Sequence, residues 1–111
     1  MSLVDLRRLA AKVTTAYDNQ VVARINDHVV RLSVMTEAYP WHRHPGSDEM
    51  FLVLEGGLRI ELPDRAVDLC EGQGFTVPAG LAHRTRPLGA RSVNLTVESA
   101  DAETVRLEAG G

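Results

Sequence analysis

The chain has 111 residues, of which 44% are hydrophobic and 24% charged, and its formal net charge is -3 at pH 7. A chain of this length can bury one core, so we expect a single domain over residues 1–111. The small negative charge and the scattered basic residues argue against nucleic acid or an anionic membrane as a partner.

The cysteine content and the N-terminal charges indicate a cellular compartment. Cys70 is the single cysteine, which rules out an intrachain disulfide and fits a reducing environment. Charged residues such as Asp5, Arg7 and Lys12 interrupt any apolar segment that a signal peptide would need. No later stretch is long and apolar enough to span a membrane. We therefore expect a cytoplasmic protein.

The N-terminal segment is predicted to form a short amphipathic helix. Apolar side chains within residues 3–13 recur at helical spacing on one face, and the charged side chains lie mostly off that face. Ser2 is the expected N-cap. We assign residues 1–20 to this helix and a lead-in, with the helix covering one end of the core.

The rest of the chain has the two-residue period of β-strands. Residues 28–36, 58–62 and 92–98 alternate, and turns rich in glycine and proline separate such segments. This pattern predicts an all-β sandwich or barrel over residues 21–98, followed by an edge strand or a loose tail at 99–111. The apolar faces of the first and last of these segments consist of His28, Val30, Leu32 and Val34, and of Val93, Leu95 and Val97.

Two histidines precede an apolar strand. His42 and His44 are two residues apart, so on a strand both imidazoles leave the same face, close enough to share one ion. Glu49 has the wrong parity for the same face on a continuous strand. The turn residues 45–48, which include Pro45 and Gly46, can reset that parity and return the carboxylate to the histidines.

The strand that begins at Glu49 is apolar on both sides. Phe51 and Val53 share the face of Glu49, which we expect to line the interior. The opposite face consists of Met50, Leu52 and Leu54, and it needs a second sheet or a second subunit to cover it. We therefore expect a homodimer.

A second motif lies downstream and supplies a further candidate ligand, His83. The run His42-x-His44-x4-Glu49-x6-Gly56 resembles the first motif of the cupin family, and Gly72-x5-Pro78-x-Gly80-x2-His83 resembles the second. Fifteen residues separate the two motifs, as is typical of small single-domain cupins. The resemblance implies a double-stranded β-helix, the jelly-roll barrel of cupins. It also implies that His42, His44, Glu49 and His83 hold a metal ion.

The resemblance covers the chain from Trp41 to His83 by motif and about residues 20–98 by strand pattern. Two positions depart from the family. Thr36 stands where a glycine is usual six residues before the first histidine, and Pro87 replaces an asparagine four residues after the last. In the family neither position holds the metal, so the departures concern turn geometry.

The chemistry of such a site follows from its donors. Three neutral imidazoles and one carboxylate around a divalent ion leave a local charge of about +1, which favours an anionic ligand. Nitrogen-rich donors suit a divalent transition metal, namely Fe, Mn, Ni, Cu or Zn. Four protein ligands leave up to two octahedral positions free. A hydroxy acid, a keto acid or an enediol can fill them, as can a substrate beside dioxygen.

Two functions from different classes follow. The first is a metal-dependent enzyme, dioxygenase- or isomerase-like, acting on a small polar or anionic molecule. The alternative is a non-catalytic module that binds or senses a small ligand through its metal, and a structural dimer with a vestigial site is a third possibility. No general base stands out, and Arg59, Arg84 and Arg86 are the candidates for attracting an anion.

Three further side chains have simpler interpretations. His28 fits neither motif, so we interpret it as an ordinary strand residue. Met35 and Phe51 can either line the pocket near the ion or fill the core.

Overall fold

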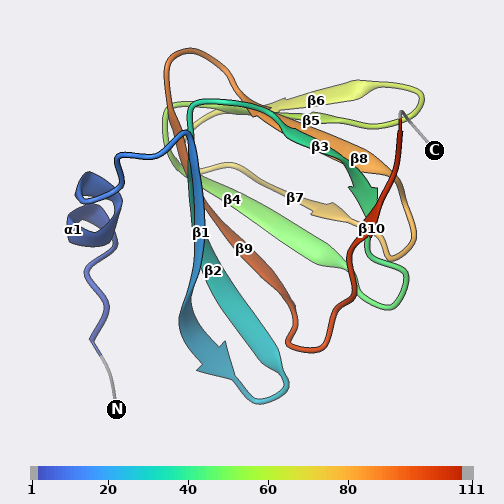
Figure 1. Ribbon diagram of the computed structural model, residues 1–111, viewed down its shortest axis with the longest axis horizontal. Coiled ribbons are helices and arrows are strands. Elements are labelled where there is room, and N and C mark those ends of the chain that lie inside the picture. The colour runs from blue at the N-terminus through green and yellow to red at the C-terminus, as the bar shows by residue number, and fades with distance from the viewer. Residues whose placement is uncertain (1–2, 109–111) are drawn as a thin grey trace.

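Short alternating segments, separated by glycine and proline turns, fold into ten strands after one short helix in the computed structural model (Figure 1). The structure describes residues 3–108. In chain order the elements are α1 (Leu6–Ala11), β1 (Tyr17–Ile25), β2 (His28–Met35), β3 (Tyr39–Arg43), β4 (Glu49–Glu55), β5 (Leu58–Glu61), β6 (Ala66–Leu69), β7 (Gly74–Val77), β8 (His83–Pro87), β9 (Ser92–Ser99) and β10 (Val105–Arg106).

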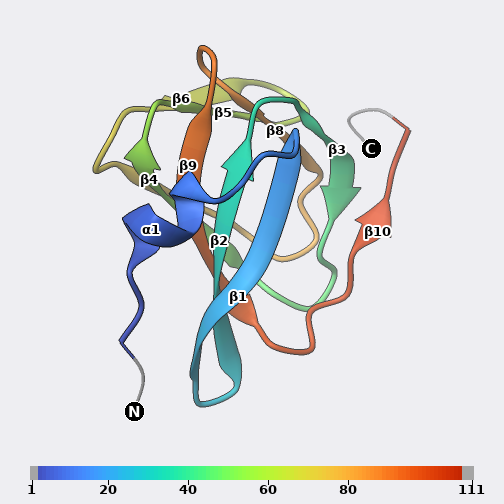
Figure 2. The ribbon, with the colours of Figure 1, turned by 60° about the vertical axis from the view of Figure 1, so that its left-hand side comes forward.

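The strands form two five-stranded antiparallel sheets that face each other (Figure 2). The first sheet has the order β1-β2-β9-β4-β7 and the second has the order β10-β3-β8-β5-β6. Strands distant in sequence are neighbours in both sheets, for example β2 with β9 and β3 with β8. This is the predicted all-β jelly roll, a double-stranded β-helix.

The space between the sheets is apolar at one end and polar at the other. Its apolar end is a cluster of buried side chains: Met35, Phe51, Val53, Leu58, Ile60, Leu62, Leu69 and Val77. Leu58 and Ile60 are completely buried. Burial of such side chains contributes about 1.5–3 kcal/mol each and fixes the frame on which the polar end is built.

The outer face of the first sheet is also apolar, and α1 covers part of it. Leu32, Val34 and Val93 form a second buried cluster with Ala10 of the helix. The predicted grouping of apolar residues on one face of β2 and of β9 is therefore confirmed, but these faces point away from the space between the sheets. The interior faces of the same two strands carry polar residues.

The helix is shorter than predicted. It begins at Leu6, and Asp5 is its N-cap, because the Asp5 carboxylate accepts a hydrogen bond of 3.1 Å from the backbone N–H of Arg8. The predicted cap, Ser2, lies outside the described residues.

The barrel differs slightly from the predicted boundaries. Strand β1 begins at Tyr17, four residues before the expected start, and β9 ends at Ser99. At the C-terminus β10 pairs with β3, through Val105 with Arg43, so this segment contains an edge strand. Among the described residues, no helix is both long and apolar enough to cross a membrane.

Glycine is required where β4 turns into β5. Gly56 has a φ of 70°, and a Cβ there would lie 2.1 Å from the carbonyl oxygen of Arg91. By contrast, Thr36 has no positive φ. The backbone at Thr36 therefore does not need the glycine that is usual there in the family, and its N–H donates to the Ala16 carbonyl at 2.8 Å.

Candidate metal centre

Three strands bring four donor residues to the polar end of the barrel. His42 lies on β3 and His44 follows that strand directly, while Glu49 begins β4 and His83 begins β8. The turn at 45–48 resets the strand parity, so the Glu49 carboxylate returns to the histidines. One ligand atom from each residue lies within 4.8 Å of every other, and all four residues are buried.

Each histidine is oriented by a backbone carbonyl. The Nδ1 atom lies 2.8 Å from the Pro40 oxygen in His42, 2.9 Å from the Glu103 oxygen in His44, and 2.9 Å from the Leu81 oxygen in His83. A carbonyl only accepts, so each Nδ1 must carry the proton, and in the neutral ring Nε2 then has a free lone pair. Histidines that bind metals typically donate the N–H of the other ring nitrogen to such a carbonyl.

The free donor atoms converge on one point. Oε1 of Glu49 lies 3.1 Å from Nε2 of His44 and 3.2 Å from Nε2 of His83. With neutral rings these contacts would place lone pairs against lone pairs, so a positive charge must lie among them. The residues therefore fit a cation, and their nitrogen-rich donor set fits a transition metal.

The pKa values show how the metal-free site supplies that charge. Burial by itself lowers the pKa of His44, but its hydrogen bond with Glu49 and the negative charge there raise it to about 8. Burial raises the pKa of Glu49, but the hydrogen bonds from His44 and His83 lower it to about 2. Burial and the nearby His83 lower the pKa of His42 to about 4. A proton on His44 thus occupies the place that a cation would take.

Three of the four donors, His42, His44 and Glu49, line one side of a pocket of about 310 Å³ between the sheets. Apolar and aromatic side chains line part of it, including Tyr17, Met35, Tyr39 and Phe51. Met35 and Phe51 also belong to the buried core cluster, so both roles considered for them hold at once.

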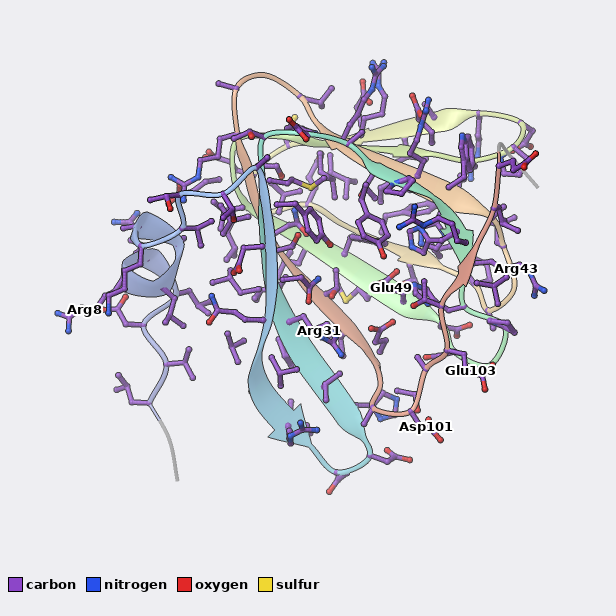
Figure 3. All side chains as sticks on the ribbon, viewed as in Figure 1. Arg8, Arg31, Arg43, Glu49, Asp101 and Glu103 are labelled. Atoms are coloured by element: carbon purple, nitrogen blue, oxygen red, sulfur yellow. The ribbon has the colours of Figure 1, made fainter. Side chains whose placement is uncertain are left out.

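The opposite wall of the pocket is polar, and its key residues were not identified from the sequence. Arg31 on β2 (Figure 3) and Glu98 on β9 line the pocket, and Arg31 Nε lies 3.4 Å from Glu98 Oε1. Burial and then the negative charge of Glu49 raise the pKa of Glu98, while His44 and Arg31 oppose the rise. The alternation placed both residues opposite the apolar faces of their strands, but gave no sign that this side faces the interior.

The three arginines considered for attracting an anion lie elsewhere. Arg59 forms a bidentate ion pair with Asp68, and Arg84 and Arg86 both pair with Glu61. These pairs lie on β5, β6 and β8, on the face of the second sheet turned away from the pocket, because the alternate residues Leu58, Ile60, His83 and Thr85 are the buried ones. The candidate role of the three arginines was therefore wrong.

His28 lies outside the site, as its lack of a motif suggested. It is exposed at the start of β2, where its Nδ1 lies 2.7 Å from the Asp27 carboxylate.

Comparisons with known proteins place this site in a family. The sequence model of the cupin domain matches residues 28–98. The chain is 43% identical over 105 residues to the uncharacterized protein YdbB of Bacillus subtilis, covering 94% of this chain and 92% of that protein. It is 31% identical over 87 residues to polyketide synthase CurC of Streptomyces cyaneus, covering 77% of this chain but only 51% of CurC.

The fold also occurs in a solved structure. A Klebsiella pneumoniae protein with a double-stranded β-helix domain has a TM-score of 0.82 at 17% identity, covering 97% of this chain and 98% of that one. The likeness to that structure concerns the fold, whereas the family match covers both histidine motifs and most of both sheets. On this evidence the chain belongs to the cupin family.

Proposed function

We propose that the chain is a metal-dependent enzyme, dioxygenase- or isomerase-like, that acts on a small polar or anionic molecule. The supporting observation is the buried convergence of one ring nitrogen from each of three histidines and one carboxylate oxygen beside a pocket of about 310 Å³. A volume of this size holds a small molecule next to the donors.

His42, His44, Glu49 and His83 would hold the ion. A divalent ion of Fe, Mn, Ni, Cu or Zn would supply Lewis-acid or oxygen-activating chemistry when bound. With three neutral histidines and one carboxylate, the loaded site has a charge of about +1 and attracts an anion. The backbone carbonyls that accept hydrogen bonds from the three Nδ1–H groups hold the imidazole rings in position when a small molecule binds to or leaves the ion.

The remaining pocket residues would bind and orient the substrate. Tyr17 and Tyr39 pack with ring centroids 5.0 Å apart, and Tyr39 meets the His42 ring edge-on at 4.8 Å. These rings and Phe51 give the pocket an apolar side that excludes water, while Arg31 and Glu98 give it a polar side. A substrate with oxygens at one end and a small carbon skeleton matches this division.

The name of one relative supports an oxygen-rich substrate. CurC is named a polyketide synthase protein, and polyketides carry oxygens at regular spacing along a carbon chain. Two such oxygens can bind one ion as a chelate, as can those of hydroxy and keto acids. This chain spans about half of CurC, so we carry over only the chelating chemistry of the ligand.

The metal content of protein purified without a chelating tag tests the proposal. Apo protein is then reloaded with Fe²⁺, Cu²⁺, Ni²⁺ or Zn²⁺ and offered hydroxy acids, keto acids and 1,3-dicarbonyl compounds. Oxygen uptake reports oxygenase activity, and exchange of carbon-bound protons in D₂O reports isomerase activity. Glu49→Gln should abolish the signal, whereas His28→Gln, which changes a histidine outside the site, should retain it.

The outcomes separate the two functions. Substrate-dependent turnover that needs Glu49 supports the enzyme. Tight metal and ligand retention with no turnover by any of the metals supports the non-catalytic binding or sensing module instead. Failure of the wild type to retain any divalent metal contradicts both.

We also propose that the chain forms a homodimer through the outer face of its first sheet. Val30, Val97 and Met50 are cross-strand neighbours on β2, β9 and β4, and Met50 is 39% exposed. A two-fold axis lets this patch cover its own copy. In sedimentation experiments Met50→Glu should yield monomer, and Ala66→Glu, at an exposed residue on β6 of the second sheet, should not. A wild type that is monomeric at micromolar concentration contradicts the dimer.

A further inference from the structure

Three buried side-chain atoms in the pocket have no hydrogen-bond partner within the described residues: Arg31 Nε, Thr96 Oγ1 and Glu98 Oε2. Arg31 and Thr96 are direct cross-strand partners on β2 and β9, and Glu98 follows two residues later on the same face. Buried polar atoms in folded proteins are almost always paired. Two of these atoms, Arg31 Nε and Glu98 Oε2, have only ion-pair contacts of 3.4 and 3.8 Å, so all three can still form a hydrogen bond to a ligand in the pocket.

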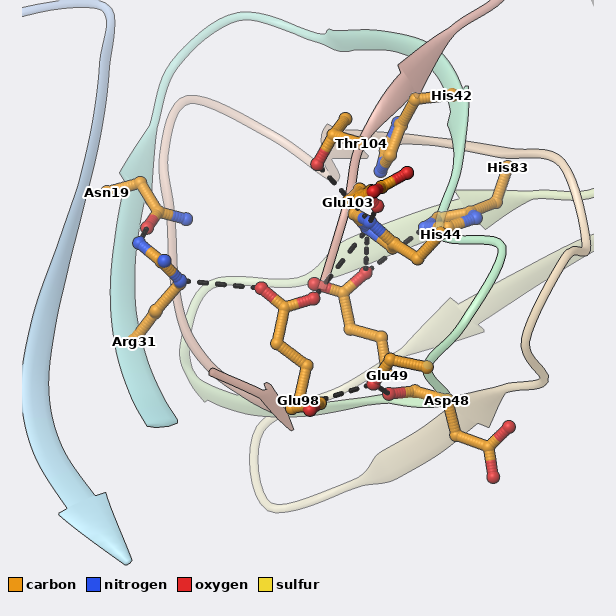
Figure 4. A network of polar contacts seen from close by, with 12 residues as sticks. Asn19, Arg31, His42, His44, Asp48, Glu49, His83, Glu98, Glu103 and Thr104 are labelled. Carbon is orange, nitrogen blue, oxygen red and sulfur yellow. Dashed lines mark hydrogen bonds and ion pairs between the residues drawn. The ribbon is translucent and has the colours of Figure 1, made fainter. Parts of the chain in front are cut away.

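Glu98 links this wall to the metal centre. Its side chain lies between Arg31 and His44, with Oε1 at 3.4 Å from Arg31 Nε and Oε2 at 3.8 Å from His44 Nε2 (Figure 4). The residue is only 8% exposed. Asn19 accepts a hydrogen bond of 3.3 Å from Nη1 of Arg31, which holds the guanidinium in place. The unpaired Oε2 therefore faces whatever occupies the pocket beside the four donors.

We propose that Arg31, Thr96 and Glu98 form a second subsite that binds a hydroxyl-bearing monoanion, of the α-hydroxy acid class, next to the metal centre. This inference rests on the proposed function of that centre. A carboxylate oxygen only accepts hydrogen bonds, so Glu98 Oε2 needs a donor. A ligand hydroxyl supplies one, whereas the keto oxygen of the corresponding keto acid has only lone pairs to offer.

The donors of the subsite complement the other end of such a ligand. Arg31 and the Thr96 hydroxyl can both donate to a carboxylate, and guanidinium groups suit carboxylates through their planar arrangement of N–H groups. The charges agree as well. Arg31 and Glu98 cancel each other, so the loaded pocket keeps a charge of about +1, which one monoanion neutralises.

Lactate and pyruvate test the subsite, because they have the same charge and skeleton and differ in the hydroxyl. Each is titrated into Co²⁺-loaded protein, and the visible absorption of the ion reports binding without any turnover. The variants are Glu98→Met, which removes the acceptor, and the isosteric Glu98→Gln, with Glu55→Gln as a control at an exposed carboxylate on β4. The affinity for Co²⁺ alone is measured for every variant.

We expect wild type and Glu55→Gln to prefer lactate over pyruvate. The ratio of the two affinities should fall about tenfold or more in Glu98→Met and by less in Glu98→Gln, because a hydrogen bond to a charged acceptor is lost or weakened. Arg31→Met should weaken both ligands about equally. The affinity for Co²⁺ should stay within about threefold of wild type in the Glu98 variants, since Glu98 is not among the four donors.

Several results would overturn the subsite. If the ratio of lactate to pyruvate affinity is unchanged in both Glu98 variants, Glu98 does not contact the ligand hydroxyl. If lactate does not bind to the loaded wild type, the subsite does not take α-hydroxy acids. A loss of Co²⁺ affinity in Glu98→Gln as large as in Glu49→Gln would make Glu98 a metal ligand instead. Wild type that binds no Co²⁺ at all is the distinct failure of the proposed function, and the subsite falls with it.

Discussion

The metal-free and metal-loaded forms should respond to pH in opposite directions. In the metal-free protein the proton on His44 is held by Glu49, with 3.1 Å between Nε2 and Oε1. Raising the pH removes this proton and leaves two lone pairs facing each other. We therefore expect the metal-free protein to lose stability between pH 6.5 and pH 9, a range in which most proteins change little.

The size of the effect follows from the pKa of His44, which rises from 6.5 to about 8 on folding. A raised pKa stabilises the folded state fully below the unfolded value of 6.5, and this contribution is lost as the pH rises through about 8. The loss between pH 6.5 and pH 9 is about 1.5 kcal/mol, or roughly 8 °C in Tm for a domain of this size. His44 is almost fully buried, so solvent does not screen the interaction.

The other titrating groups of the site do not obscure this window. The lowered pKa of Glu49, about 2, contributes stability that is present above 4.5 and is lost only as the pH falls through about 2. The lowered pKa of His42, about 4, contributes stability that is present above pH 6.5 and is lost as the pH falls through about 4. The raised pKa of Glu98, like that of His44, makes the folded state less stable as the pH rises.

In the loaded protein the ion takes the place of the proton, so its affinity and the stability it adds should rise with pH over the same window. The assay is urea denaturation at several pH values, with a chelator or with excess Zn²⁺. Glu49→Gln should flatten the profile of the metal-free form, because no negative charge then holds the His44 proton. Glu55→Gln, on the same strand but exposed, should leave it unchanged. Metal-free stability that is level or increases between pH 6.5 and pH 9 would refute the reasoning.

Three further predictions concern the site and its frame. Glu49→Gln should weaken metal binding at least about a hundredfold in chelator competition, because the anionic donor is lost. His28→Gln should bind the metal as the wild type does, and equal metal affinity of the two variants would show that Glu49 is not a ligand. Deletion of residues 100–111 removes the Glu103 carbonyl that orients the His44 ring, so metal affinity should fall about 10–100-fold in a chain that still melts cooperatively. Unchanged metal affinity would contradict that role of Glu103. Gly56→Ala should destabilise the fold by at least about 2 kcal/mol, because its φ of 70° and the contact at 2.1 Å exclude a side chain; Gly46→Ala, with open space around it, should change the urea midpoint little, and equal effects would contradict the argument.

Much of the fold was predictable from local patterns. Alternation identified β2, β5 and β9, and two spaced motifs identified as a set the four residues that meet in the candidate metal site. The turn at 45–48 could be inferred too, because Pro45 and Gly46 interrupt a strand just where the parity of Glu49 must change. Each of these inferences depends on residues that are close in sequence, where spacing and turn chemistry determine geometry.

The ends of elements and the roles of surface charges were less predictable. Asp5 caps the helix that begins at Leu6, whereas the predicted cap, Ser2, lies outside the described residues. Arg84 was a reasonable candidate for binding an anion by charge alone. Its partner, Glu61, is distant in sequence and comes beside it only when β5 pairs with β8.

Strand period, turn residues and motif spacing are local properties, so they were enough to predict β2, β5, β9, the turn at 45–48 and the four residues of the candidate metal site. Which face of each strand lies inside depends on contacts between the sheets. In β2 and β9 the apolar face is outside, beneath α1, and the polar face, with Arg31 and Glu98, lines the pocket. Both faces of the first sheet bury side chains, so alternation shows that a strand has two faces without showing which of them faces the second sheet.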